Sequence, residues 1–252
     1  MAERNSLEIR NLYVKVENKE IIKSLSLTIK SGEIHTIMGP NGSGKSSLLN
    51  AIFAHPKYKI TKGSIKFNGK DLRKLATDEI ARLGIFLGLQ YPTEIPGVSF
   101  TKFLRTAKNL QSENPHIRPD EFIEMLEKTS KTLGFKSSLL ERELNEGFSG
   151  GEKKRAEIVQ MAILKPKIAV LDEIDSGLDV DALKNVAKNL EKIQKNDKTG
   201  ILLITHYERI LKYLVPNYVH IMIEGEIIKS GTKALAKRIE KHGYEEYINI
   251  SK

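Results

Sequence analysis

The chain has 252 residues, of which 40% are hydrophobic and 29% charged, and it contains no cysteine. This composition predicts a soluble globular protein and argues against a disordered or fibrous one. No apolar run approaches the roughly 20 residues that span a bilayer, and we expect no export because MAERNSLEIR lacks the apolar core of a signal peptide. Without cysteine the chain cannot hold an iron–sulfur cluster through its own sulfurs.

The strand and helix patterns alternate along the first half of the chain. Strands are predicted over 7–16, 21–29 and 32–38, and a helix over 46–53. A hairpin is predicted over 63–72, with its turn at Asn68-Gly69. The glycines and prolines of LGLQYPTEIPGVS then lead into a segment with helical spacing from about Thr101 to Leu144.

The second half returns to alternating helices and strands. A helix is predicted from Glu152 to near Pro166, then a buried parallel strand over 167–173, because KIAVLDE is a continuous apolar run. The remaining predictions are a helix over 181–195, a strand over 201–206, a hairpin over 219–231 and a helical tail over the last twenty residues. This order predicts an α/β fold with a mostly parallel sheet, and a helical subdomain over about 91–147 inserted in a single domain.

A phosphate-binding loop is predicted between the third strand and the following helix. GPNGSGKS matches G-x-x-x-x-G-K-[ST] in the strand-then-helix context that this motif requires. Its residues are Gly39, Pro40, Asn41, Gly42, Ser43, Gly44, Lys45 and Ser46. We expect Lys45 to reach the β- and γ-phosphates of a nucleotide and the Ser46 hydroxyl to bind Mg²⁺. Ser47 is expected to assist at the α-phosphate.

Acidic residues and a histidine end two of the predicted core strands. Asp172 ends the apolar strand over 167–173, so we expect it at the carboxyl edge of the sheet as a magnesium ligand. Glu173 follows and is expected to act as the base that orients or deprotonates the attacking water. His206 ends the strand over 201–206, where it can hydrogen-bond the γ-phosphate. Catalysis is therefore assigned to Glu173, His206 and Lys45.

A second anion site is predicted at FSGGEKKR, the signature run Phe148–Arg155. Ser149, Gly150 and Gly151 open a predicted helix, and helix N-termini bind anions. The order of the glycine loop, a glutamine-bearing loop at Gln90, the signature run, Asp172, SGLD and His206 resembles that of the ATP-binding cassette ATPases over essentially the whole chain. Phe148 and Glu152 replace the leucine and glutamine that are usual in that family.

The resemblance implies the fold of the ATP-binding cassette: a P-loop core with a mostly parallel sheet, an antiparallel β subdomain and an inserted helical subdomain. It also implies a head-to-tail dimer in which Ser149, Gly150 and Gly151 act on the ATP held by the other copy. Asp179 matches the loop that crosses the dimer interface, and Gln90 matches the loop that binds Mg²⁺ and senses the γ-phosphate. ATP and Mg²⁺ are the implied cofactors. At the position of the family's usual adenine-stacking aromatic residue, this chain has Val16, with Tyr13 nearby.

Several runs resemble more narrowly the ATPase of the Suf iron–sulfur cluster assembly system, of SufC type. They include FLGLQYPTEIPGVS, GFSGGEKKR, LDEIDSGLDVDALK and VPNYVHIM. This resemblance implies a cytoplasmic ATPase whose partners are scaffold subunits of SufB and SufD type. We expect the scaffold to dock on the segment from Gln90 to Phe100 and on the helical subdomain, without nucleic acid and without membrane insertion.

Three alternatives stay open. The ATPase subunit of a membrane importer would share every catalytic residue and differ in what its helical subdomain binds. A DNA-associated cassette ATPase is suggested by the net charge of +9, although the lysines are scattered along the chain and interleaved with glutamates. A non-catalytic nucleotide switch is disfavoured by Glu173.

Overall fold

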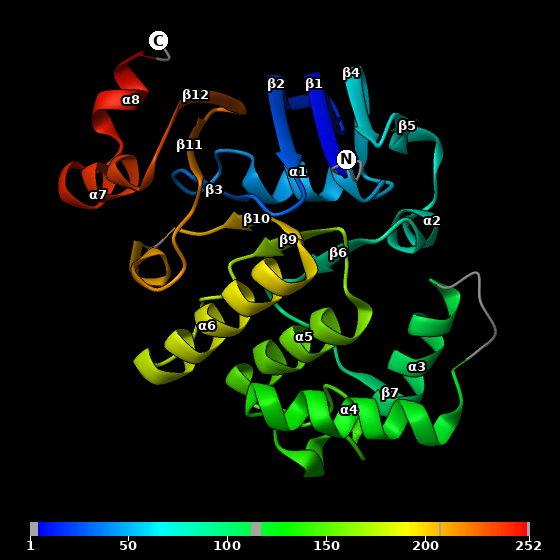
Figure 1. Ribbon diagram of the computed structural model, residues 1–252. Helices are drawn as coiled ribbons and strands as arrows, with labels where there is room; N and C mark the ends of the chain where they lie inside the picture. Colours follow the sequence, from blue (N-terminus) through cyan, green and yellow to red (C-terminus); the bar gives the residue numbers. More distant parts are fainter. Residues whose placement is uncertain (1–4, 112–116, 207, 251–252) are drawn as a thin grey trace.

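The structure is a computed structural model that describes residues 5–111, 117–206 and 208–250. Its elements lie in layers: an antiparallel sheet, helix α1, a second sheet and a group of helices follow one another down Figure 1. Parts of two predictions lie outside the described residues, namely 112–116 in the helical segment and 251–252 in the tail.

The N-terminal strands form a four-stranded antiparallel sheet with the order β2-β1-β4-β5. Its strands are β1 (Ser6–Val16), β2 (Lys19–Lys30), β4 (Tyr58–Phe67) and β5 (Lys70–Asp71). Leu7 and Ile9 of β1 are buried and Glu8 between them is not, because successive side chains of a strand point to opposite faces. The hairpin predicted at Asn68-Gly69 is confirmed by the pairing of β4 with β5.

The central sheet has the order β12-β11-β3-β10-β9-β6. Its strands are β3 (Ile34–Met38), β6 (Ile85–Gly88), β9 (Ile168–Asp172), β10 (Gly200–Ile204), β11 (Tyr218–Ile223) and β12 (Glu226–Gly231). Neighbouring strands are parallel except β11 and β12, which form the hairpin predicted at Glu224-Gly225. Every residue of β3, β9 and β10 is buried, which explains their continuous apolar runs. The mostly parallel sheet predicted from the sequence is confirmed.

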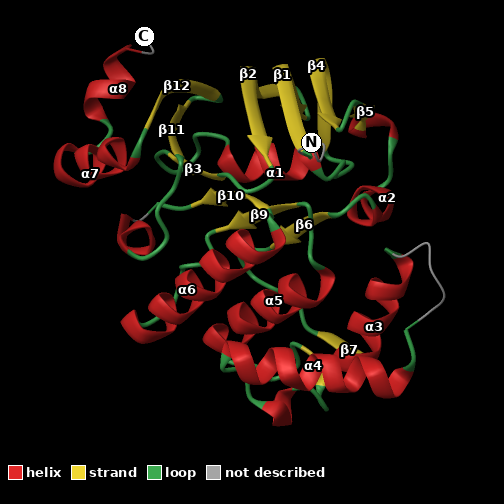
Figure 2. Ribbon diagram, viewed as in Figure 1, coloured by secondary structure: helices red, strands yellow, loops and turns green. Residues whose placement is uncertain are grey.

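Helices cover both faces of the central sheet (Figures 1 and 2). Helix α1 (Lys45–Ile52) fills the space between the two sheets, where its Leu48 and Ile52 are fully buried. Helices α5 (Gly150–Leu164) and α6 (Val180–Asp197) lie on the other face. The buried side chains form one apolar cluster on each face, and burying each Leu or Ile stabilises the fold by about 1.5–3 kcal/mol.

Two helices between β6 and β9 lie farther from the central sheet (Figure 2). They are α3 (Phe100–Leu110) and α4 (Pro119–Leu133), followed by the short turn η2 (Ser137–Leu139). The predicted helical spacing up to Leu144 is wrong at its end, because Glu143–Leu144 form strand β8 and pair with β7 (Ile95–Ser99). A two-residue strand is too short to show a periodicity of its own.

The remaining helical elements are short. They are η1 (Leu72–Lys74), α2 (Thr77–Arg82), η3 (Glu208–Lys212), α7 (Lys233–His242) and α8 (Glu245–Ile250). Helices α7 and α8 confirm the predicted helical tail over its described residues, as two helices and not one. Among the described residues, no helix combines the length and the hydropathy that crossing a bilayer requires.

Candidate functional site

The phosphate loop over residues 39–47 runs from the carboxyl end of β3 into the first turn of α1, which begins at Lys45. Gly42 and Gly44 have φ angles of 78° and 104°, which L side chains rarely adopt. A Cβ at Gly44 would also come within 3.0 Å of the side chains of Ile22 and Met222. No side chain of the described residues caps α1, so the N–H groups of its first turn are available to an anion. The loop therefore has the backbone shape and the partial positive charge that a phosphate requires.

Lys45 lies inside this loop and is only 5% exposed. Its ammonium donates hydrogen bonds to the carbonyl oxygens of Gly39 and Pro40, both at 2.9 Å. Burial lowers the pKa of Lys45 to about 8, and the charges of Glu173 and Asp172 oppose that shift. The side chain is therefore mainly protonated at neutral pH, as a group that neutralises phosphate oxygens must be.

Asp172 is the last residue of β9 and is 8% exposed. Burial raises the pKa of Asp172, and a hydrogen bond with the Ser46 side chain opposes this rise. Its Oδ1 atom is buried without a hydrogen-bond partner among the described residues. Mg²⁺ prefers oxygen ligands, and here an unpaired carboxylate oxygen lies beside a hydroxyl. Ser46 and Asp172 therefore fit a magnesium ion.

Glu173, Gln90 and His206 meet at the carboxyl edge of the central sheet. Gln90 and His206 come after β6 and β10, the two strands that flank β9. The Gln90 amide donates a hydrogen bond to one carboxylate oxygen of Glu173, and His206 Nε2 lies 2.7 Å from the other. This arrangement places a carboxylate, an amide and an imidazole where they can orient and deprotonate a water molecule.

The backbone of Glu173 takes an unusual conformation at this point. Its φ angle is 44°, a left-handed value that costs a non-glycine residue of order 1–3 kcal/mol. The Glu173 N–H donates a hydrogen bond to the Ile204 carbonyl oxygen at 2.9 Å, which holds the peptide in place. Strain of this kind persists at functional sites because the surrounding structure fixes the side chain in one direction.

The sequence also predicts nucleotide binding by a second set of residues: Ser149, Gly150, Gly151 and Asp179. The side-chain hydrogen bonds of Ser149 and Asp179 stay within the helices that these residues begin. Ser149 is the N-cap of α5 and forms a reciprocal capping box with Glu152, whose pKa these contacts and Lys136 lower to about 2. Asp179 is the N-cap of α6 and accepts a hydrogen bond from the Ala182 N–H at 2.7 Å. Ser149 and Asp179 are exposed. They are accessible to a second molecule, and no contact of theirs in the described residues reaches the phosphate loop.

A buried ion pair of α5 that the sequence analysis did not assign contacts the residue before Gln90. Lys154 and Glu157 are 3% and 5% exposed, with 3.6 Å between the ammonium and a carboxylate oxygen. The Leu89 N–H donates to Glu157 at 2.8 Å, and the Lys154 ammonium donates to the Leu89 carbonyl oxygen at 2.5 Å. No signal in the sequence predicts this pair, because Lys154 and Glu157 stand in the charged run EKKRAE, where nothing marks these two side chains as buried. Helix α5 therefore holds the loop that carries Gln90 through two hydrogen bonds, one to the N–H and one to the carbonyl oxygen of Leu89.

Asp175 is a second polar residue that the sequence analysis did not assign. It is 1% exposed, and its carboxylate accepts a hydrogen bond from the Thr205 hydroxyl at 2.8 Å. Burial raises the pKa of Asp175, and the Thr205 hydrogen bond opposes the rise. Because Thr205 immediately precedes His206, this contact ties the loop after β9 to the residue that carries the imidazole.

The position expected to face adenine has an aromatic neighbour from another strand. Val16 is paired across the antiparallel sheet with Tyr58 of β4. The ring of Tyr58 lies edge-on to His55, with 5.4 Å between the ring centroids. Tyr13 instead faces the Lys62 ammonium, which lies 5.4 Å from its ring centroid. The pairing of Val16 with Tyr58 was not predicted, because pairing between separate strands is not visible in a local pattern.

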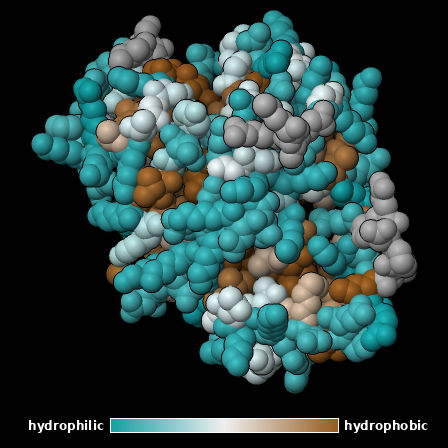
Figure 3. All heavy atoms as spheres, viewed as in Figure 1, coloured by the Kyte–Doolittle hydropathy of each residue, from teal (hydrophilic) through white to brown (hydrophobic). Residues whose placement is uncertain are grey.

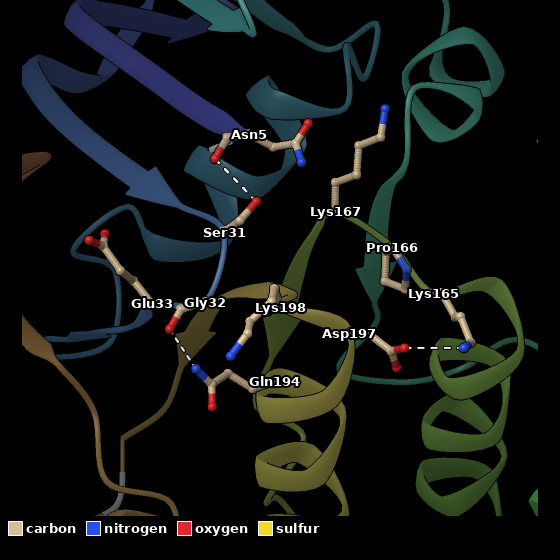
Figure 4. Close-up of a pocket in the computed structure, with 10 residues that line it drawn as sticks. All are labelled: Asn5, Ser31, Gly32, Glu33, Lys165, Pro166, Lys167, Gln194, Asp197 and Lys198. Carbon is tan, nitrogen blue, oxygen red and sulfur yellow. Dashed lines mark hydrogen bonds and ion pairs between the residues drawn. The ribbon is translucent and has the colours of Figure 1, made fainter. Parts of the chain in front are cut away.

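A cavity of about 520 Å³ lies at the opposite edge of the central sheet, near the start of β3, β9 and β10 (Figure 4). Lys165, Lys167 and Lys198 line it, and Lys165 pairs with Asp197 at 3.2 Å. Helices α5 and α6 end there, and the partial negative charge of helix C-termini favours lysines and disfavours a phosphate. We therefore assign no nucleotide to this cavity.

Comparison with known proteins gives a consistent result. The sequence model described as ABC transporter matches residues 22–176. "Vegetative protein 296" of Bacillus subtilis (strain 168) is 50% identical to this chain, covering 96% of the chain and 92% of that protein. The "Probable ATP-dependent transporter ycf16" of Antithamnion sp. is 47% identical, covering 99% of the chain and 100% of that protein. A solved dimeric structure of a bacterial ABC transporter cassette has a TM-score of 0.77 at 21% identity, covering 90% of this chain and 98% of that one.

The family match covers more than half of the chain, and the two relatives extend over nearly all of it. The solved cassette has the same fold, with the antiparallel and helical parts expected from the sequence. Cassettes of this family bind ATP, use Mg²⁺ and hydrolyse ATP, and they act as dimers with transmembrane or other subunits. The chain therefore belongs to the ABC transporter family of ATP-binding cassettes and is a Mg²⁺-dependent ATPase.

Proposed function

We propose that this ATPase is the SufC-type subunit of the Suf iron–sulfur cluster assembly complex. The proposal is supported by the run EIPGVS after Gln90 and the run EKKR in the signature, two features that generic transport ATPases seldom combine. The absence of cysteine is consistent with a subunit that drives motion and leaves metal ligation to a scaffold. Such a complex works in the cytoplasm, where we place the chain.

The observation that carries the proposal is the contact between these two runs. Lys153 of EKKR forms an ion pair with Glu94 of the EIPGVS segment, with 2.7 Å between the charged atoms. Lys154 of the same run contacts the Leu89 carbonyl oxygen. A displacement of the surface around Glu94 would therefore be transmitted through these two contacts to helix α5 and to the loop that carries Gln90.

We propose the following roles within one subunit. The N–H groups of the phosphate loop and Lys45 hold the β- and γ-phosphates, and Ser46, Asp172 and Gln90 bind Mg²⁺ directly or through water. Glu173 deprotonates or orients the attacking water, and His206 hydrogen-bonds the γ-phosphate. The contacts of Glu173 with Gln90 and His206 support this assignment, because all three groups then face one reacting oxygen.

We propose that the second half of each reaction site comes from another copy of the chain. Ser149, Gly150 and Gly151 at the N-terminus of α5 would face the γ-phosphate held by the partner, and Asp179 would lie at the seam. Ser149, Gly150 and Asp179 are exposed, and within the described part of the chain their hydrogen bonds stay inside their own helices, which supports an action between subunits. ATP would draw the two copies together, and loss of the γ-phosphate would release them.

The scaffold partners would be of SufB and SufD type, with one copy of this chain on each. We propose that the chain is a single cassette domain and that the inserted helical subdomain, about 91–147, together with Gln90–Phe100, forms the docking surface. Tyr91 is 78% exposed, which supports a partner at this surface. Apolar side chains also gather between the central sheet and α3 in Figure 3, where Phe86 and Phe103 line a cavity of about 380 Å³.

The ATPase subunit of a membrane importer is the alternative. The names of several relatives, among them "Probable ABC transporter ATP-binding protein" and "Probable ATP-dependent transporter", favour it. The two functions differ in the partner that the docking surface holds and not in the ATP site.

Affinity purification of the chain from its native cell separates these functions. The proposal predicts scaffold proteins of SufB and SufD type together with bound iron, whereas membrane permeases would identify an importer subunit. Glu94→Lys should break the pair with Lys153 and weaken both scaffold capture and partner-stimulated ATPase, and Glu191→Lys on the exposed face of α6 serves as the control. Unchanged capture and stimulation in Glu94→Lys would remove this surface from the proposal.

A further inference from the structure

The C-terminal segment contacts the ATP site through Tyr244. Helix α7 ends before Gly243, which has a φ of 70° and donates a hydrogen bond to the Ile239 carbonyl oxygen at 2.7 Å. This positive φ redirects the chain, so Tyr244 packs against the apolar cluster that contains α5 and α6. The Tyr244 carbonyl oxygen accepts hydrogen bonds from the N–H groups of Tyr247 and Ile248, both at 3.0 Å. The position of Tyr244 is therefore fixed on both sides.

Tyr244 and His206 line one cavity of about 230 Å³. Met38 also lines it and is the last residue of β3, directly before Gly39 of the phosphate loop. Glu208 and the other lining residues of η3 and α7 close the remaining sides. The cavity therefore touches both the strand that leads into the phosphate loop and the loop that carries His206.

The hydroxyl of Tyr244 is buried and has no hydrogen-bond partner among the described residues. Burial raises the pKa of Tyr244 to about 12, and a backbone hydrogen bond from Gly39, whose geometry falls short of a full bond, opposes that rise. A buried hydroxyl without a full hydrogen bond lowers the stability of a fold, and phenylalanine at the same position would not have this cost. Such a group calls for a physical explanation, and its neighbours here belong to the ATP site.

We propose that Tyr244 is a positioning residue for ATP hydrolysis, whose hydroxyl forms a well-aligned hydrogen bond with the Gly39 N–H when the phosphate loop and the His206 loop take their hydrolytic arrangement. Tyr244 touches no substrate and acts through these two loops. The inference rests on the roles proposed above for the phosphate loop and for His206. An interaction made only in the reactive arrangement raises kcat and leaves KM unchanged.

Tyr244→Phe tests this inference because it removes only the hydroxyl. We expect kcat at saturating MgATP to fall by roughly 3- to 10-fold, the range that corresponds to the loss of one net hydrogen bond. The KM for ATP should stay within about 2-fold, because phosphate binding depends on the loop N–H groups and on Lys45. The thermal midpoint should be equal to that of the wild type or higher, because an unpaired buried hydroxyl is removed. A purely structural role would move the thermal midpoint and not kcat.

Tyr247→Phe is the matched control. Tyr247 is 1% exposed, and its hydroxyl is also buried and unpaired among the described residues, but Tyr247 does not line the cavity beside His206. Its removal should leave kcat unchanged. Equal losses of kcat in both variants, or wild-type kcat in Tyr244→Phe, would overturn the inference.

His206→Ala, measured in parallel, separates this inference from the proposed function. If His206→Ala loses turnover and Tyr244→Phe does not, the proposed role of His206 stands and that of Tyr244 fails. If His206→Ala retains full turnover, the proposed ATP site itself is wrong and the inference falls with it.

Discussion

The buried ion pair of α5 gives the sharpest test of how the signature helix holds the Gln90 loop. Glu157→Leu removes one partner and leaves the Lys154 ammonium buried, with 3% of the residue exposed. Breaking a buried pair in this way costs about 3–5 kcal/mol. For a chain of this size, that corresponds to a fall of roughly 6–20 °C in the thermal midpoint.

The double variant Lys154→Met/Glu157→Leu should recover most of this loss, because apolar side chains of similar volume often replace a buried ion pair without net cost. The recovery should be incomplete, because the N–H and the carbonyl oxygen of Leu89 lose their side-chain partners in the double variant. The two single variants and the double variant form a cycle, and circular dichroism melts give its coupling energy. The turnover of the double variant should fall although its stability is restored, because the Gln90 loop is no longer held to α5.

The exposed pair Lys195–Glu191 on α6 provides the control. Its charged atoms are 2.7 Å apart, but the side chains are 66% and 43% exposed, so Glu191→Leu should cost no more than about 1 kcal/mol. If Glu157→Leu costs as little as Glu191→Leu, or if the single losses of Lys154→Met and Glu157→Leu simply add in the double variant, the reasoning about the buried pair is refuted.

Two further predictions concern the base and a buried histidine pair. Glu173→Gln should keep MgATP bound while turnover falls by about 10²–10⁴-fold, the usual contribution of a general base, as filter-binding and phosphate-release assays will show; undiminished turnover would contradict the role of Glu173. Burial lowers the pKa of His220 to about 4 and also lowers the pKa of His35, whose Nδ1 lies 3.1 Å from His220 Nε2. Because the unfolded chain then binds protons more readily than the folded one, the free energy of unfolding is highest above about pH 6.5. Below about pH 6.5 it falls by about 1.4 kcal/mol per pH unit for His220. Thermal melts at pH 7.5 and pH 5 should show this loss of stability in the wild type and in the exposed control His242→Gln. The loss should be smaller in His220→Gln. Equal losses in all three proteins would contradict the burial of His220 as the cause.

Local patterns predicted the parts of the fold that have a strong periodicity or a strict spacing. The apolar run ending at Asp172 is of the kind expected for a buried strand of a parallel sheet, and the glycine spacing from Gly39 to Lys45 indicated a turn before a helix. Strand β6 was not predicted, because its four residues IFLG show no alternation that separates them from their surroundings. The pairing of β7 with Glu143–Leu144 was missed for a different reason, since it depends on residues more than forty positions apart.

The site divides in the same way. The location of Asp172, Glu173 and His206 at one edge of the sheet was predictable, because each lies at or just after the end of an apolar strand, and strands of a parallel sheet end at one edge. Asp175 and Tyr244 were not assigned, because what distinguishes them is burial beside Thr205 and Gly39, which only the folded chain creates. Contacts within the sequence neighbourhood are readable from spacing, and contacts between distant segments are not.

The dependence of ATP hydrolysis on protein concentration tests the central claim most directly. If each reaction site is built from two copies, the specific activity of the isolated chain must rise with its concentration. Ser149→Ala must lower the activity by about 100-fold, because it removes one preorganised donor worth on the order of 3 kcal/mol in the transition state. A specific activity that is constant on dilution, together with wild-type turnover in Ser149→Ala, would contradict a shared site.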